Sequence, residues 1–541
     1  MNNITNLLPV TSSAAVRQRL KDGAEIALLD VREEGAFALA HPLFAVNVPF
    51  GRIEERIGAL IPRKDAPVVV YDDGEGRTAQ AIHLLQSLGY LNVTALEGGL
   101  EGWKLSGGEI FIDVNVPSKA FGELVEHVRH TPSLPAREVH ERIERGDDLV
   151  ILDARRFVEY NVMSIPGGRS VPGGELALRV RDIAPSPQTT VIVNCAGRTR
   201  SIIGTQSLVN VGIPNPVFAL RNGTIGWTLE GLSLEHGAAR KGGDVSEPNL
   251  KFSRARAIHL SERTGVRSVS ASVLEHLLAD PARSVYRLDV RSPEEYVQGH
   301  LAGFRSAPGG QLVQATDEWV AVRHGTIVLA DDDGVRGRMT AHWLRQLGWD
   351  EVYVLEGWEG LPVETGLESP VLLRPLPDVA TISPAQLHER AEGGDILVLD
   401  LATSPEFRRG HIPGARFVIR PDLVSRLAFF TVEDIVLVSP DGIAAHLAAQ
   451  DLAGEKNRRV RVLKGGTQAW QAAGYALESG LDAGKVLSAP DDVYKRPYEG
   501  TDNASEAMQS YLDWEFGLVA QLEKDGTHGF RVLEEEIQAT F

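Results

Sequence analysis

The chain has 541 residues, too many for one hydrophobic core, and at about 150 residues per domain it is predicted to form three to five domains. Apolar residues make up 43% and charged residues 24%, as in ordinary soluble globular proteins, and the net charge of −18 argues against binding to nucleic acid or to an anionic membrane. No uncharged run reaches the roughly 18 residues of a membrane span, and the N-terminus lacks a secretory pattern, so we expect a cytoplasmic protein.

The first pattern along the chain is an apolar run that ends in aspartate, and it occurs four times. These runs are ALLDVR, VILDAR, YRLDVR and LVLDLA, with the aspartates at Asp30, Asp153, Asp289 and Asp400. A second β-branched run follows each of them, and the residues directly after it are Asp72, Cys195, Asp331 and Ser439. The two landmarks are 42 residues apart in three copies and 39 in the fourth, which indicates four copies of one structural unit.

Each copy continues with a helical pattern and then a third apolar run. In the first copy, for example, Ala81, Leu84, Leu85 and Leu88 lie on one face of a helix. Short β-branched strands that alternate with amphipathic helices predict an α/β domain, in which a small parallel sheet carries helices on both faces. The tryptophan after the third run in three copies is expected to be a core residue: Trp103, Trp227 and Trp470.

The spacing of the repeats predicts four tandem domains and a C-terminal tail. We place the domains at residues 1–112, 113–243, 244–370 and 371–484, and expect the second and third to begin with a linker helix. Residues 485–541 form the tail, in which a helix is predicted from Asn503 with Leu512, Val519 and Leu522 on one face. We expect this helix to pack on the repeats, although binding to a partner is the alternative.

The single cysteine, Cys195, lies in the segment VIVNCAGRTRS between a predicted strand and a helix that is predicted to begin near Arg200 or Ser201. It cannot form an internal disulfide, so another molecule must discharge any sulfur that it carries. A loop in this position directs backbone N–H groups toward the side chain, and the helix N-terminus adds positive potential. With Arg198 and Arg200 close by, these effects predict a thiolate at pH 7 rather than a buried, inert thiol.

Several motifs recur at fixed places in the unit. They are LDVR or LDAR at the first run, GHLAGF at 299–304, GHIPGA at 410–415, CAGRTRS in the second copy, and an LEGG or LKGG turn. With these motifs the unit resembles the rhodanese-like domain of sulfurtransferases over about residues 10 to 480. The resemblance implies a five-stranded parallel sheet in each domain, with the active loop at the carboxyl end of a central strand.

The resemblance also implies the chemistry of the second repeat. Cys195 would take the sulfane sulfur of thiosulfate as a persulfide, release sulfite, and pass the sulfur to cyanide or a thiol. We expect the substrate to bind the loop residues Ala196, Gly197, Arg198, Thr199 and Arg200. Among these, Arg198 is expected to contact the substrate, and Arg200 to have a structural and electrostatic role.

Other groups are assigned supporting roles or none. Asp153 and Arg155 are expected to belong to the framework behind the loop. We expect no metal and no cofactor, and the predicted partners are a small sulfur-donor anion and a thiol acceptor. The oligomeric state stays open.

Three alternatives to thiosulfate sulfurtransferase activity follow from the same residues. The protein could be a persulfide carrier or scaffold, or it could use 3-mercaptopyruvate or another sulfane-sulfur donor. Phosphatase or arsenate-reductase chemistry is disfavoured, because only four residues separate Cys195 from Arg200, whereas tyrosine-phosphatase-like loops have five.

The other three repeats are predicted to be inactive, because Asp72, Asp331 and Ser439 are not competent sulfur nucleophiles. Arg77 and Arg336 stand at the offset of Arg200, and we expect them to pair with the aspartates of their loops. The related segments SVPGGEL and SAPGGQL, in repeats two and three, are expected to have a role in the fold.

Overall fold

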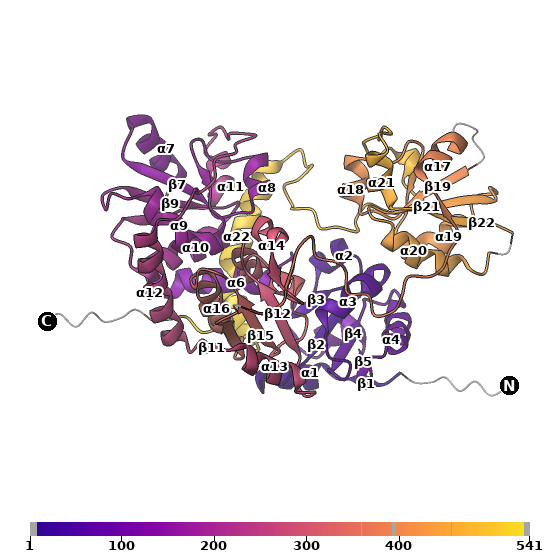
Figure 1. Cartoon of the computed structure of the whole chain (residues 1–541), viewed down its shortest axis with the longest axis horizontal. Helices are drawn as coiled ribbons and strands as arrows, with labels where there is room; N and C mark the ends of the chain where they lie inside the picture. The colour runs from indigo at the N-terminus through magenta and orange to yellow at the C-terminus, as the bar shows by residue number, and fades with distance from the viewer. Residues whose placement is uncertain (1–7, 359, 392–395, 456, 535–541) are drawn as a thin grey trace.

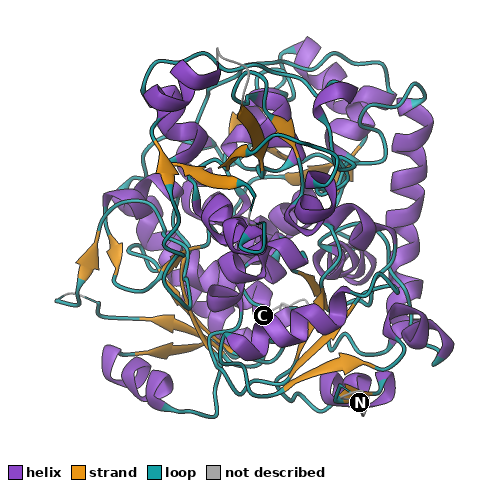
Figure 2. Ribbon diagram, turned by 90° about the vertical axis from the view of Figure 1, so that its right-hand side faces the viewer, coloured by secondary structure: helices purple, strands orange, loops and turns teal. Residues whose placement is uncertain are grey.

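The structure, a computed structural model, describes residues 8–358, 360–391, 396–455 and 457–534. Each repeat contains one five-stranded sheet in which all neighbouring strands are parallel, so the predicted α/β class is confirmed. Figure 1 shows the four units in chain order from indigo to orange, and Figure 2 shows the strands as small groups with helices around them. A small antiparallel pair, β13 (His300–Leu301) with β17 (Val363–Glu364), is added to repeat three.

The strand order is the same in every sheet. In repeat one it is β1-β5-β4-β2-β3, with strands β1 (Val10–Thr11), β2 (Ala27–Asp30), β3 (Ala45–Asn47), β4 (Val68–Tyr71) and β5 (Val93–Leu96). In repeat two it is β6-β10-β9-β7-β8, with β6 (Ser133–Leu134), β7 (Leu149–Asp153), β8 (Arg169–Ser170), β9 (Thr190–Asn194) and β10 (Val217–Leu220).

Repeats three and four follow the same order. The third sheet is β11-β16-β15-β12-β14, with β11 (Arg267–Val269), β12 (Val285–Asp289), β14 (Arg305–Ser306), β15 (Thr326–Ala330) and β16 (Val352–Leu355). The fourth is β18-β22-β21-β19-β20, with β18 (Thr381–Ile382), β19 (Ile396–Asp400), β20 (Arg416–Phe417), β21 (Asp434–Val438) and β22 (Arg459–Leu463).

The second apolar run of each repeat forms the central strand of its sheet and leads through a loop into a helix. These helices are α4 (Arg77–Ser87), α10 (Thr199–Val211), α16 (Arg336–Gln346) and α20 (Ile443–Ala449). In α4 the predicted apolar face is correct, since Ala81 and Leu85 are fully buried. The Asp72, Cys195, Asp331 and Ser439 positions therefore lie at the carboxyl ends of central strands, where open α/β sheets bind ligands.

The tryptophans after the third run are core residues, as predicted. They lie in α5 (Gly99–Leu105), α11 (Gly223–Leu229) and α21 (Gly466–Ala472), and all three side chains are buried. Each indole N–H donates to the backbone carbonyl six residues further on, at Glu109, Ser233 and Ala476. The buried donor is thereby satisfied, and the burial of the rings argues against a role in ligand stacking.

The repeats associate in two pairs through equivalent segments. Repeats two and three contact each other at Gly174 and Gly310. A Cβ added to Gly174 would lie 2.9 Å from the Gly310 nitrogen, and a Cβ added to Gly310 would lie 2.7 Å from the Gly174 nitrogen. The PGG segments thus need glycine because two backbones approach closely, which confirms their role in the fold. Repeats one and four meet at the equivalent place, where a Cβ on Gly51 would lie 3.1 Å from the Pro421 ring.

The linker and tail helices are built into the main body of the protein. Helix α6 (Val116–Arg129) precedes repeat two, α12 (Glu247–Thr264) precedes repeat three, and α22 (Ala504–Asp525) forms the tail. The largest apolar core joins repeats one and three with residues of α6 and α22, and in Figure 1 the yellow tail returns from the fourth repeat toward the second. Packing of the tail on the repeats is therefore confirmed, with Leu512, Leu518 and Leu522 as its buried apolar positions.

Among the helices that the structure describes, none is both long enough and apolar enough to cross a bilayer.

Candidate active site

Cys195 directly follows β9, and its side chain points into the loop that leads to α10. The residue is 2% exposed, and its Sγ lies 3.4 Å from the hydroxyl of Ser201. The Ser201 hydroxyl also lies 2.8 Å from the carbonyl oxygen of Arg198, so it links the sulfur to the far side of the loop. The predicted helix begins at Thr199, close to the expected start at Arg200 or Ser201.

The start of α11 holds the backbone of the cysteine loop in place. The N–H of Thr224 donates to the Cys195 carbonyl at 2.9 Å, and the N–H of Ile225 donates to the Ala196 carbonyl at 3.0 Å. The approach requires Gly223, whose φ is +55°, because a Cβ there would clash with the Cys195 carbonyl oxygen and lie 2.6 Å from that of Gly197. The loop conformation thus depends on a helix that follows the next strand.

Replacing Gly223 by alanine should destabilise the protein by about 1–3 kcal/mol, because the added methyl group overpacks the loop and the left-handed backbone disfavours a side chain. Urea unfolding should show the loss. Gly231→Ala is the matched control, since Gly231 has a φ of +72° but nothing within 4 Å of its added Cβ. An equal loss in both variants would attribute the effect to backbone conformation alone.

The ionisation state of Cys195 differs from the one predicted from its neighbours. Burial raises the pKa of the thiol, while the positive charge of Arg200 and hydrogen bonds from Ser201 lower it and the carboxyl of Glu515 raises it further. The balance lies above the ordinary thiol value, so the thiol form predominates at pH 7. The sequence interpretation was wrong here because it included the cations of the loop but not the desolvation of the sulfur.

The rate of alkylation of Cys195 by iodoacetamide should therefore rise with pH and reach half its maximum above the ordinary thiol pKa of about 8.5. Because the chain holds only this cysteine, the alkylated mass reports on it alone. A midpoint below 8 in the free protein would show that the loop overcomes the cost of burial.

Arg198 does not point freely into the active-site cavity. Its guanidinium group donates to both carboxylate oxygens of Glu123 at 2.7 and 2.8 Å, to Asn222 at 3.0 Å, and also to Glu126. The group also lies 4.1 Å from the ring centre of Phe516 on α22. These contacts connect the loop to α6 and the tail, and they leave the predicted contact with substrate without support from this geometry.

Arg200 is the cation whose charge acts on the sulfur. Its two terminal nitrogens form a fork with the carboxylate of Glu159, at 2.9 and 3.0 Å. Burial would raise the pKa of Glu159, but Arg200 and its neighbours hold it well below the ordinary value, so the pair is ionised. The attraction between Arg200 and Cys195 agrees with the electrostatic role expected for Arg200.

Asp153 and Arg155 form a buried ion pair behind the loop. The Arg155 side chain donates to Asp153 at 2.9 and 2.7 Å and to the carbonyl of Met163 at 2.6 Å. Equivalent pairs, Asp30 with Arg32 and Asp289 with Arg291, occur in repeats one and three. The shared arrangement indicates a framework role.

Cys195 lies at one side of a cavity of about 180 Å³ that several distant segments enclose. Repeat two contributes the cysteine loop together with Arg156 and Glu159, and repeat three contributes Gln311, Gln314 and Glu318. The rest of the lining comes from the linker before and within α6 (Val114, Asn115 and Lys119) and from the tail (Tyr494, Arg496, Tyr498, Tyr511 and Glu515). Sequence reasoning missed the linker and tail residues, because no motif of the repeat extends to them.

The silent loops contain side chains that occupy the place of the sulfur. In repeat one, Asp72 accepts the backbone N–H groups of Arg77 and Thr78 at 2.6 and 2.9 Å. In repeat four, the Ser439 hydroxyl accepts the N–H of Ala445 at 3.2 Å. The loop amides therefore already hold an internal oxygen, which agrees with the prediction that these repeats are inactive.

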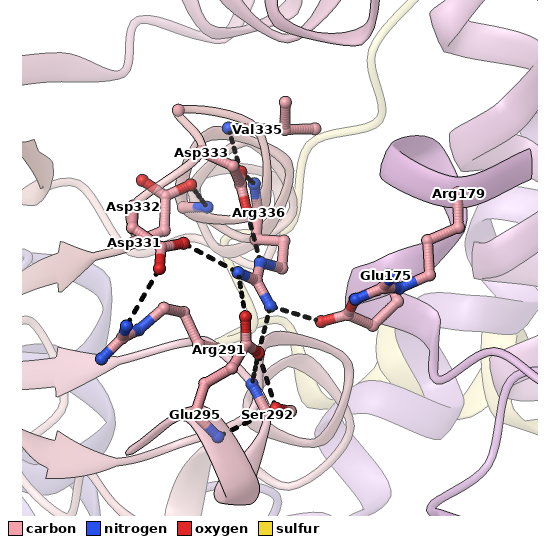
Figure 3. A network of polar contacts seen from close by, with 12 residues as sticks. Glu175, Arg179, Arg291, Ser292, Glu295, Asp331, Asp332, Asp333, Val335 and Arg336 are labelled. Carbon is pink, nitrogen blue, oxygen red and sulfur yellow. Dashed lines mark hydrogen bonds and ion pairs between the residues drawn. The ribbon is translucent and has the colours of Figure 1, made fainter. Parts of the chain in front are cut away.

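In repeat three, the loop at the cysteine position and the start of α16 form part of the contact with repeat two (Figure 3). Arg336 donates to Glu295 at 2.7 and 2.9 Å, to Asp332 at 2.9 Å, and across the domain boundary to Glu175 of repeat two at 2.8 Å. Asp331 accepts the backbone N–H of Gly337 at 2.9 Å.

The predicted pairing of these arginines with the aspartates of their loops is confirmed for Arg336, which pairs with Asp332 and Asp333, and is wrong for Arg77. The Arg77 side chain reaches Glu33 at 3.2 Å instead, because the loop amides already satisfy Asp72. Arg336 also pairs with Glu175, and it thereby links repeats two and three.

The fold and the cysteine loop define a rhodanese-like protein, and the rhodanese-like domain family matches residues 12–106, 135–230, 270–360 and 383–473, so the chain belongs to this family. Over 97% of its length the chain is similar to a crystal structure of thiosulfate sulfurtransferase from Pseudomonas aeruginosa, with 52% identity, a TM-score of 0.94 and all of that chain covered.

Two curated relatives cover smaller parts of the chain. A thiosulfate sulfurtransferase from Pseudomonas aeruginosa is 30% identical over 172 residues, 28% of this chain, and the chain spans 62% of that relative, less than two thirds of its length. A thiosulfate sulfurtransferase from Azotobacter vinelandii is 24% identical over 241 residues, 37% of this chain and 87% of the relative.

Proposed function

We propose that this protein is a sulfurtransferase that moves the sulfane sulfur of thiosulfate to a thiol or to cyanide through a persulfide on Cys195. The observation that carries the proposal is the place of the only cysteine, in a cavity that Arg156, Arg200 and Arg496 also line. Cations in a partly desolvated cavity stabilise a dianionic donor and the sulfite that leaves it. The names of the relatives support the same donor.

The reaction has two half-reactions. The resting Cys195 thiol first loses its proton to water. The thiolate then attacks the outer sulfur of thiosulfate, the sulfur–sulfur bond of the donor breaks, and sulfite leaves with the bonding electron pair. The persulfide then gives its outer sulfur to the acceptor, and the Cys195 thiolate is regenerated. Because Cys195 is 2% exposed and the tail lines its cavity, small acceptors are favoured over a protein acceptor, and this favours an enzyme over a persulfide carrier.

Intact mass measurement tests the first half-reaction directly. Mixing the full-length protein with thiosulfate should add one sulfur atom, and adding cyanide should remove it and release thiocyanate. Equal concentrations of 3-mercaptopyruvate and thiosulfate, applied separately, should load Cys195 faster from thiosulfate. A protein that stays unloaded with every donor would refute the proposal, and one that loads but does not turn over would be a carrier.

A further inference from the structure

The tail helix places a carboxyl group directly against the cysteine loop. Glu515, on α22, is 1% exposed and lines the same cavity as Cys195. Its Oε2 would lie 3.3 Å from a Cβ on Gly197, and the ring of Tyr511 would lie 3.6 Å from that Cβ. Gly197 thus leaves room for the carboxyl group two residues from the reacting sulfur. This helix lies outside the four matched domains, which end at residue 473.

One oxygen of Glu515 has no hydrogen-bond partner. Oε1 accepts the Tyr511 hydroxyl at 3.3 Å, whereas Oε2 is buried and unpartnered among the residues that the structure describes. A buried polar atom without a partner is costly, and such atoms occur where a substrate or a proton will satisfy them. The oxygen next to the loop is therefore free to take up or release a proton.

The surroundings of Glu515 allow both of its protonation states near neutral pH. Burial raises its pKa to about 8, Lys119 and Arg198 lower it, and Glu123 and Asp113 raise it. These groups face Glu515 from α6, from the segment before α6 and from the cysteine loop, while Tyr498 and Tyr511 face it from the tail. A group whose pKa lies near the working pH is suited to act as both acid and base.

We propose that Glu515 is the general acid–base residue of the sulfur transfer, taking the proton of the acceptor thiol and returning it to the departing sulfite. This inference rests on the proposed function. It assigns a catalytic group to the tail, outside the four repeats.

The proton and the charges balance over the two half-reactions. In the second, ionised Glu515 takes the proton of R–SH, R–S⁻ attacks the outer sulfur of Cys195–S–S⁻, the bond between the two sulfurs of the persulfide breaks, and R–S–S⁻ and the Cys195 thiolate form. In the first, that thiolate attacks thiosulfate, and protonated Glu515 gives its proton to the sulfite that leaves as HSO₃⁻. The sum converts R–SH and S–SO₃²⁻ into R–S–S⁻ and HSO₃⁻, with no oxidant or reductant.

The test separates a thiol acceptor from cyanide, because ionised cyanide has no proton to lose. Full-length protein loaded with thiosulfate is mixed with 2-mercaptoethanol, or with cyanide at a pH at which cyanide is ionised, and decay of the persulfide is followed by intact mass. In Glu515→Gln the thiol step at pH 7 should be about 10²-fold slower, the size of effect expected for a lost general base. The cyanide step should be unchanged.

The pH dependence of the thiol step gives a second test of the role of Glu515. In the wild-type protein the rate of the thiol step should rise to a plateau near pH 8, where Glu515 ionises. In Glu515→Gln this rise to a plateau near pH 8 should disappear. The rate should instead keep rising with pH until the acceptor thiol itself ionises. Glu523→Gln, an exposed position on the same helix, should match the wild type in every measurement.

Loading of the Glu515→Gln variant by thiosulfate shows that its loop is folded and reactive. Two results in Glu515→Gln would overturn the role of Glu515. One is an unchanged rate of the thiol step that still rises to a plateau near pH 8, and the other is equal slowing with the thiol and with cyanide. Failure of the wild-type protein to load at all would instead refute the proposed function.

Discussion

Replacement of Cys195 by serine should abolish sulfur transfer, with a loss of thiosulfate–cyanide turnover on the order of 10⁴-fold or more, as for other covalent nucleophiles. A serine hydroxyl in this loop is not ionised, and the chain offers no second thiol. Release of thiocyanate and the mass gained from thiosulfate should both fall to the background level.

Stability serves as the control for this variant, because serine is smaller than cysteine and Ser201 can still accept or donate a hydrogen bond at this site. The circular dichroism spectrum should be unchanged, and the midpoint of urea unfolding should change little. Turnover that persisted in Cys195→Ser would identify another nucleophile and contradict the proposed mechanism.

The second large effect is expected from Arg200. In Arg200→Met the pKa of the Cys195 thiol should rise further and persulfide formation should slow by about 10²–10³-fold, because the positive charge beside the sulfur and the leaving sulfite is lost. Stability should also fall, by about 1–3 kcal/mol, since Glu159 loses its two hydrogen bonds from Arg200 and keeps only the longer contacts with Arg156 and Arg496.

Two companion variants separate these effects. Glu159→Gln combined with Arg200→Met should recover part of the lost stability but none of the rate, because it removes a partly buried carboxylate that would pair only with Arg156 and Arg496, and it does not restore the cation. Arg198→Met should destabilise the protein through Glu123 and Glu126 and change the KM for thiosulfate less than Arg200→Met does. A larger rise in KM in Arg198→Met would show that Arg198 binds the substrate.

The reuse of the silent repeats was only partly predictable. The residues at the cysteine position showed that repeats one, three and four lack a nucleophile, and the copied PGG segments indicated a role in the fold. The pairing of repeats through Gly174 and Gly310, and the contact between Arg336 and Glu175, depend on how finished domains pack together. Such contacts join residues far apart in sequence, which no local pattern encodes.

The same distinction applies to the active site. The loop, its nucleophile and the start of the following helix are local features, and each was predicted close to its observed place. The partners of Arg198 and the protonation state of Cys195 depend on α6 and α22, so neighbours in sequence did not indicate the partners of the arginine, and they indicated the wrong direction for the thiol pKa.

The sequence by itself determined the four-fold repeat, the α/β class with its parallel sheets, and the single position able to act as a sulfur nucleophile. These features follow from short-range periodicity and residue chemistry, which every copy of the unit repeats. Only the tertiary structure decided that Glu515, about 320 residues beyond Cys195, lies against the cysteine loop and that both groups are desolvated. Burial and close approach result from the packing of whole elements, and they set the pKa values on which the chemistry depends.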